Sequence, residues 1–133
     1  MSRDQYIISY NKNKRLLNWV SWKLETQDIG KDPRAKQFTT DTDLEKYLLK
    51  KGEKPAVAPD EYSQSCFDRG HQTPSKDRTD TQINNEATFN MSNIVPQTPY
   101  LNRVLWEHLE QYTRDNVTKK IKKLTSSQDL FMT

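Results

Sequence analysis

Residues 101–114 have the sequence LNRVLWEHLEQYTR, which is the most regular stretch of the chain. Apolar and aromatic side chains recur in it with a period of about 3.6, and this pattern predicts an amphipathic helix of about four turns. The apolar stripe consists of Leu101, Val104, Leu105, His108, Leu109 and Tyr112. Because a helix with such a stripe normally buries it, we expect Leu105, Trp106 and Leu109 to pack against the rest of the protein.

A polar stripe flanks the apolar one on the predicted helix. At about 100° per residue, each four-residue step from Asn102 to Glu110 and on to Arg114 advances about 40° around the axis. An amide, a carboxylate and a guanidinium therefore lie along one edge. The basic segment 119–124 that follows could extend the helix, complement its dipole or contact phosphate, and a solvated face is the simpler interpretation.

The N-terminal third of the chain predicts a hairpin followed by a short helix. Tyr6–Tyr10 and Leu17–Leu24 are rich in aromatic and β-branched residues, and a polar, turn-prone segment (11–14) separates them. Apolar residues at helical spacing predict a helix over Asp43–Lys50.

Two later segments are predicted to be irregular. Glu61–Arg78 contains a glycine, a proline and many short polar residues, so we expect a surface segment of the kind that often carries functional groups. Asn93–Pro99 contains Pro96 and Pro99, each of which removes a backbone donor and restricts the preceding residue.

The composition limits the classes of protein that fit. The chain has 133 residues, a formal net charge of +3 and 32% hydrophobic residues, which predicts one domain with a thin core. No apolar run approaches the roughly 20 residues that a bilayer requires, and no secretory signal is visible. One cysteine and two histidines cannot build a usual zinc site, so any metal must be held mainly by oxygen ligands.

The tetrapeptide Asp68-Arg69-Gly70-His71 has the groups that phosphodiester cleavage needs. Such a reaction requires a base for the attacking water and positive charge against the anionic transition state. A free imidazole has a pKa of about 6.5, so much of it can accept a proton at neutral pH. Taken alone, a histidine in a loop is more often an ordinary surface residue.

Three motifs in order give the tetrapeptide a context. Residues 62–74, YSQSCFDRGHQTP, resemble the tyrosine, the D-R-G-H and the trailing proline of the DNA/RNA non-specific endonuclease family, the ββα-metal nucleases. Residues 86–97, EATFNMSNIVPQ, resemble the T-F-x-x-S-N-x-x-P-Q of that family. Residues 102–110 reproduce its N-x-x-x-W-x-x-L-E, and the resemblance extends over residues 6–116.

The resemblance implies a metal-dependent hydrolytic site. By this resemblance His71 is the general base that activates water, and Asn102 is the direct protein ligand of Mg²⁺, with Mn²⁺ as the alternative ion. Glu110 is expected to hold the waters of that ion. Sparse protein ligation suits magnesium, which prefers octahedral oxygen coordination and retains water.

Arginines and three further polar residues complete the expected site. Arg69 and Arg114 match arginines of the family site, and Arg34 matches an earlier one in a less specific stretch; all three are expected to stabilise phosphate charge. An ion pair between Glu110 and Arg114 is the simpler alternative for that arginine. The residues expected to bind substrate or to support the site from behind are Asp68, Asn93 and Gln97.

The implied fold is α+β, with an antiparallel sheet, the ββα-metal motif and one long helix that carries site residues. Residues 1–133 are expected to form a single non-specific endonuclease domain. The relatives continue beyond the position that matches the end of this sequence, so the domain is expected to be partial and the sheet incomplete. Self-association could then complete the sheet.

The implied activity is endonucleolytic hydrolysis of DNA and RNA to 5′-phosphate products, with DNA and RNA as partners and no membrane. The alternatives are a weakly active or inactive remnant that only binds nucleic acid, and a small basic structural protein, which would not explain the ordered motifs. Relatives are secreted, periplasmic or organellar, and the sequence does not identify the compartment.

Overall fold

The computed structural model describes the backbone of residues 1–126 and the side chains of residues 1–119. The helices and strands in chain order are β1 (Ile7–Asn11), β2 (Leu16–Ser21), α1 (Thr42–Lys50), β3 (Asp68–His71), α2 (Gln82–Ala87), β4 (Ile94–Gln97) and α3 (Glu107–Ser126). Short 3₁₀ turns lie at Thr26–Asp28, Pro59–Tyr62, Ser75–Asp77 and Met91–Asn93, and a π-helical turn, Leu101–Trp106, leads into α3. The predicted α+β class is confirmed, with two separate antiparallel strand pairs among these residues.

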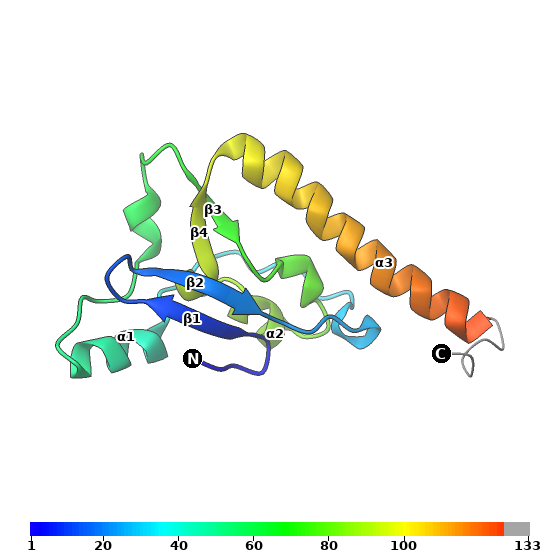
Figure 1. Cartoon of the computed structure of the whole chain (residues 1–133), viewed down its shortest axis with the longest axis horizontal. Helices are drawn as coiled ribbons and strands as arrows, with labels where there is room; N and C mark the ends of the chain where they lie inside the picture. Colours follow the sequence, from blue (N-terminus) through cyan, green and yellow to red (C-terminus); the bar gives the residue numbers. More distant parts are fainter. Residues whose placement is uncertain (127–133) are drawn as a thin grey trace.

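The N-terminal hairpin and the first helix follow the sequence prediction. β1 pairs with β2 in antiparallel register, although β2 ends at Ser21 rather than at Leu24. The side-chain oxygen of Asn11 closes the turn by accepting hydrogen bonds from the backbone amides of Asn13 and Lys14. The hairpin crosses the middle of the molecule, α1 lies below one end of it, and α3 runs along the opposite side (Figure 1).

The second strand pair corrects two predictions. The segments Glu61–Arg78 and Asn93–Pro99 were expected to be irregular, but β3 lies in the first, β4 lies in the second, and the two strands pair antiparallel. Pro96 is tolerated because the pair has only two strands, so a proline on an edge strand can direct its missing donor away from the partner. Pairing also buries the end of β3, so His71 is not on an exposed loop.

Gly70 is required by the close approach of β4. A Cβ atom at this position would lie 2.3 Å from the side-chain oxygen of Gln97, which packs across the glycine. A larger residue would push Gln97 aside or separate the strands. The glycine therefore determines how near β3 and β4 come at the residue that precedes His71.

The π-helical turn and α3, which form one continuous helix, present to solvent the face that was expected to be buried. Leu105 and Leu109 are each 50% exposed and Tyr112 is 69% exposed, so the prediction that the apolar stripe packs against the protein is wrong. The opposite, largely polar face contacts the rest of the molecule, with Arg114 only 6% exposed. The helix extends through the basic segment 119–124, whose side chains after Lys119 lie outside the described residues.

Within residues 1–126, no helix combines the length and apolar character that crossing a membrane requires.

The π-helical turn changes the expected alignment of the polar stripe. In an α-helix a four-residue step overshoots a full turn by about 40°. The π turn is wider, so the step from Asn102 to Trp106 falls short of a full turn, and the following α-helical step to Glu110 offsets that difference. Asn102 and Glu110 consequently face the same side of the helix.

Buried polar side chains organise the loops between these elements. Asn85 on α2 is fully buried; its amide nitrogen donates to the backbone oxygens of Ser75 and Arg78, and its oxygen accepts from the backbone nitrogen of Ala35 at 2.7 Å. One side chain thus satisfies backbone groups of two distant segments, which would otherwise be buried without partners.

We predict that Asn85→Ala lowers the free energy of unfolding by about 2–4 kcal/mol, because it leaves several buried backbone groups unpaired. Chemical denaturation at constant pH measures the change. Asn84→Ala is the matched control, since Asn84 is partly exposed and, among the described residues, its side chain bonds only to the side chains of Gln5 and Asp80. Equal destabilisation by the two substitutions would contradict the role of Asn85.

Candidate active site

One pocket brings together most of the predicted site residues. It has a volume of about 200 Å³ and lies between the end of β3, the turn that follows it, and the start of the long helix. Its lining includes five predicted residues, which are Arg34, Arg69, His71, Asn102 and Glu110. The remaining lining residues are Ser75, Lys76 and Glu107.

His71 is the most buried ionisable group of the pocket lining. It is the last residue of β3 and is 7% exposed. Burial, aided by the charge of Arg34, lowers the pKa of His71 to about 3. Its Nε2 atom is buried and has no hydrogen-bonding partner among the described residues. The imidazole is therefore neutral at physiological pH, and its Nε2 atom is not engaged by another side chain of the described residues.

Two phenylalanines hold the imidazole and two arginines together. The ring of His71 meets Phe89 edge-on at 4.6 Å and Phe38 at 5.4 Å between centroids. The guanidinium of Arg34 lies over the Phe89 ring at 4.9 Å, and that of Arg69 lies over the Phe38 ring at 5.2 Å. Cations are attracted to aromatic faces, so this aromatic platform positions both arginines beside the histidine.

Asn102 is oriented by Asp68 at the start of β3. Its amide nitrogen donates to the Asp68 carboxylate at 3.0 Å, and the carboxylate also accepts two hydrogen bonds of 2.8 Å from Arg103. The Arg103 guanidinium and the Asn102 amide lower the pKa of Asp68, which is therefore ionised at neutral pH. With its nitrogen occupied in this way, Asn102 has its amide oxygen available as a ligand atom.

The acidic residues of the pocket are Glu107 and Glu110. Burial raises the pKa of Glu110 to about 7, although the positive charge of Arg114 acts in the opposite direction. Glu107 forms an ion pair of 3.3 Å with Lys76 across the pocket. Glu110 is therefore only partly ionised near neutral pH, and a cation in the pocket would favour its charged form.

These ligand groups fit magnesium better than zinc. Among the described residues, no group of three or more His, Cys, Asp and Glu side chains could enclose a metal ion. The pocket instead offers the free amide oxygen of Asn102 and the carboxylates of two glutamates. Magnesium is often held by one or two protein oxygens and several waters, whereas zinc sites in proteins usually contain several nitrogen or sulfur ligands.

Besides Asp68, which contacts Asn102, three predicted site residues lie outside the pocket lining. Arg114 is buried, and its guanidinium pairs with Asp77 at 3.1 Å, so its contacts fasten α3 to the turn after β3. Asn93 is fully buried and bonds to the backbone of Thr73, which follows the histidine closely. Gln97 packs on Gly70. The structure supports these three positions as elements of the scaffold, and a direct role in catalysis stays a prediction.

The sequence did not reveal several residues of this site. Glu107 lies one turn before Glu110, and that spacing could have suggested it. Phe89 occurs in a motif that was recognised and Phe38 lies four residues after Arg34, but nothing in a single sequence shows that the two rings meet. Lys76 has no local signal, because a turn after β3 brings it to the pocket.

The sequence profile of the DNA/RNA non-specific endonuclease family matches residues 1–126. The chain therefore belongs to this family. The predicted family resemblance is confirmed.

Proteins similar to this chain include nucleases from bacteria and mitochondria. A nuclease of Nostoc sp. is 42% identical over 119 residues, which are 90% of this chain and 41% of the relative. Human mitochondrial endonuclease G is 30% identical over 115 residues, covering 85% of this chain and 36% of the relative. In the crystal structure of the EndoG/EndoGI complex, a chain with 24% identity has the same fold with a TM-score of 0.70, over 89% of this chain and 47% of that chain. The chain thus spans less than half the length of these relatives.

We predict that the free energy of unfolding depends more steeply on pH in the wild type than in a variant that lacks the His71 imidazole. The pKa of His71 is about 3 in the folded protein and about 6.5 when unfolded, so its contribution is complete above pH 6.5 and is lost as the pH falls toward 3. Between pH 7 and pH 5 the wild type should lose about 2 kcal/mol more unfolding free energy than His71→Asn. Denaturant titrations at both pH values measure this. The control His108→Asn keeps His71 and should follow the wild type; identical pH slopes for wild type and His71→Asn would contradict the burial of a neutral imidazole.

Proposed function

We propose that this chain is the site-bearing part of a metal-dependent endonuclease that hydrolyses phosphodiester bonds in DNA and RNA. The observation that carries the proposal is the pocket in which a buried, neutral imidazole lies beside two arginines and an oriented amide oxygen. The names of the relatives, nuclease and endonuclease G, agree with this activity. Residues 1–133 are proposed to act as one domain, or as part of one.

His71 acts as the general base of the proposed reaction. Its neutral imidazole takes a proton from a water molecule as that water attacks the phosphorus atom. The bond between phosphorus and the 3′-oxygen breaks, the 3′-oxygen gains a proton from solvent, and the product carries a 5′-phosphate. The low pKa of His71 keeps the imidazole unprotonated throughout the physiological range, and the negative charge of a bound phosphate would raise that pKa and so strengthen the base.

Arg34 and Arg69 stabilise the charge that develops on the phosphate. The aromatic platform holds both guanidiniums in the pocket before any substrate binds. Lys76 adds a third positive charge to the lining, partly compensated by Glu107. Because these groups recognise phosphate rather than bases, we expect little sequence preference and strong sensitivity to salt.

Asn102 would hold Mg²⁺, with Mn²⁺ as an alternative, and Glu110 would accept hydrogen bonds from its waters. When bound, the ion supplies positive charge to the scissile phosphate and the leaving oxygen. Asp68 keeps the Asn102 amide oriented through the hydrogen bond to its nitrogen. We propose Arg114 as a residue that positions Glu110 by fixing α3 rather than one that touches phosphate.

Binding of nucleic acid without cleavage is the second candidate function. The uncovered outer face of α3 favours it, because the helix that carries Asn102 and Glu110 is packed on one side only and catalysis requires accurate positions.

Self-association that completes the sheet stays a prediction. For the compartment, we favour an organelle among the secreted, periplasmic and organellar settings, since the human and yeast relatives are named as mitochondrial.

We predict that the chain degrades plasmid DNA and RNA with Mg²⁺, and that EDTA abolishes the cleavage. His71→Ala should reduce the rate about 10²–10⁴-fold, because it removes the base. His108→Ala is the matched control, since this histidine is exposed on the outer face of α3, and it should leave the rate within about twofold. Products that a ligase joins without prior phosphorylation would confirm the 5′-phosphate. Equal cleavage by wild type and His71→Ala would contradict the assignment; binding without cleavage by the wild type would favour the second candidate.

We also predict that Asp68→Ala weakens Mg²⁺ binding about 10–100-fold, because the Asn102 amide loses the acceptor that orients it. Isothermal titration of the protein with Mg²⁺, without nucleic acid, measures the affinity. Asp60→Ala removes an exposed carboxylate from the 3₁₀ turn Pro59–Tyr62 and is the control. Unchanged Mg²⁺ affinity in Asp68→Ala would exclude the orienting role of Asp68.

A further inference from the structure

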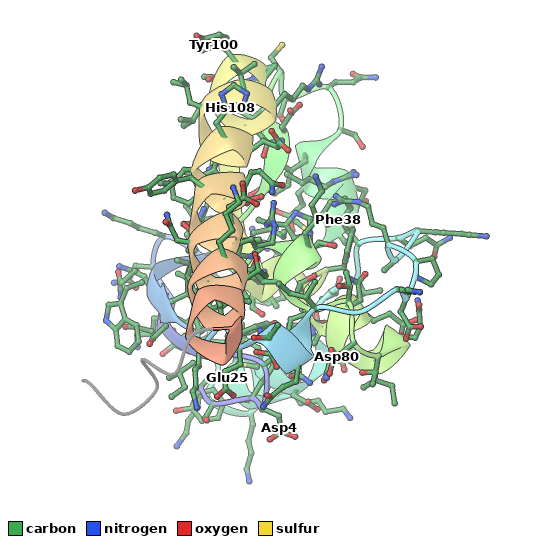
Figure 2. All side chains as sticks on the ribbon, turned by 90° about the vertical axis from the view of Figure 1, so that its right-hand side faces the viewer. Asp4, Glu25, Phe38, Asp80, Tyr100 and His108 are labelled. Carbon is green, nitrogen blue, oxygen red and sulfur yellow. The ribbon has the colours of Figure 1, made fainter. Side chains whose placement is uncertain are left out.

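Lys76 and Glu107 line the pocket at positions that the three sequence motifs do not specify. Lys76 lies on the turn Ser75–Asp77, and Glu107 is the first residue of α3. The Nζ atom of Lys76 is 3.3 Å from the Oε1 atom of Glu107. This ion pair therefore joins the turn after β3 to the long helix at the pocket. Figure 2 views the molecule with α3 in front, and Phe38 of the aromatic platform lies to the right of the helix.

A second ion pair between the same two elements makes the first one replaceable. Asp77 of the turn pairs with Arg114 of α3, and their side chains are only 1% and 7% exposed, so breaking this pair would leave buried charges without partners. The side chains of Lys76 and Glu107 are instead 56% and 41% exposed, and a pair of this kind contributes at most about 1 kcal/mol. The buried pair fixes the helix to the turn, while the exposed pair can exchange its partners without moving either element.

The carboxylate of Glu107 belongs to the same part of the pocket as that of Glu110. The two residues are three positions apart on α3, so their side chains lie on neighbouring positions of one face. Burial is the main cause of the raised pKa of Glu110, and the nearby charges of Lys76 and Glu107 also act on it, in opposite directions. Two carboxylates at one pocket repel each other, and a cation beside them relieves that repulsion. In the structure the Lys76 ammonium is the cation paired with Glu107.

We propose that Glu107 is a further residue of the magnesium site and that Lys76 occupies its carboxylate until the ion binds. This inference rests on the proposed function. Glu107 would accept hydrogen bonds from waters that Mg²⁺ retains, as Glu110 does, while Asn102 supplies the direct ligand atom. The unpartnered Nε2 atom of His71, a side chain only 7% exposed, belongs to the same pocket. A divalent ion attracts a carboxylate more strongly than an ammonium does, so Glu107 would exchange Lys76 for the ion.

This exchange couples the binding of the metal ion to the binding of nucleic acid. Once Glu107 has taken Mg²⁺ in place of Lys76, the ammonium is available for a charge-assisted hydrogen bond to phosphate. A phosphate that draws Lys76 away likewise leaves Glu107 available to the ion. Because a coupling free energy between two ligands is reciprocal, each ligand should raise the affinity of the other by the same factor. Lys76 is thus a phosphate-binding residue only when the metal site is filled.

The first test is calorimetric titration with Mg²⁺ alone, without nucleic acid, at about 0.15 M ionic strength, where distant charges are screened. Glu107→Gln should weaken Mg²⁺ binding about tenfold, because waters of the ion lose an acceptor. Lys76→Met should tighten it about two- to fivefold, because Glu107 no longer has a competing partner. In the Glu107→Gln protein, Lys76→Met should change the affinity by less than about 1.5-fold, since nothing is left to compete for.

Lys46→Met is the matched control for the loss of a positive charge. Lys46 is exposed on α1 and lies outside the pocket lining, so this substitution should leave Mg²⁺ affinity unchanged. Unchanged affinity in Glu107→Gln would overturn the proposal. An effect of Lys76→Met that is equally large with and without the Glu107 carboxylate would also overturn it, because general charge repulsion would then be the cause.

The second test measures the coupling by fluorescence anisotropy of a labelled DNA oligonucleotide bound to His71→Ala protein, with and without Mg²⁺. Adding Lys76→Met should weaken DNA binding at least about threefold more with Mg²⁺ than without it, because the lysine is released only when the ion is bound. Equal weakening in both conditions would overturn the proposal.

The two tests separate this inference from the proposed function. A wild type that binds no Mg²⁺ would refute the magnesium site itself, and with it the proposed metal-dependent reaction. Mg²⁺ binding that does not respond to Glu107→Gln would overturn only the role of Glu107 and Lys76, and would leave the proposed nuclease function in place.

Discussion

The protein depends on one constraint: loop backbone that lies in its interior must find hydrogen-bonding partners there. Apolar residues are few, and the hydrogen bonds of fully buried side-chain amides supply part of the stabilisation that a larger apolar core gives in other domains. Asn85 ties the segment before α1 to the turn after β3, and Asn93 ties Thr73, which precedes that turn, to Thr88 at the end of α2. Because both amides converge on the residues around His71, the same bonds that stabilise the fold determine where the candidate base lies.

Polar contacts rather than apolar packing also attach α3 to the rest of the protein. Its inner face is held by an indole hydrogen bond and a buried ion pair rather than by leucine packing. Such contacts are directional, so they fix the rotation of the helix about its axis more closely than an apolar stripe would. The π turn adds to this by aligning Asn102 with Glu110. Position and rotation together bring an amide and a carboxylate to the same pocket as the histidine.

The sequence was sufficient for the hairpin, for α1 and for the family, because local periodicity and ordered motifs carry that information. It also identified five residues that meet in one pocket. It failed for β3 and β4, since a four-residue strand with glycine or proline has no local signature and exists only through its partner. It failed for the direction that α3 faces because amphipathic spacing shows which residues share a face, whereas the contacts of Arg114 and Trp106 decide which face turns inward.

The aromatic platform has a consequence for how a ligand enters the pocket. Arg34 and Arg69 are each supported by a ring, and both rings also contact the imidazole. Long cationic side chains usually lose rotational freedom when they grip an anion, and that loss weakens binding. Here much of the freedom is already absent in the empty protein, so an incoming anion meets a receptor of nearly fixed shape. Affinity for compact, tetrahedral oxyanions should accordingly exceed what two unsupported surface arginines could provide.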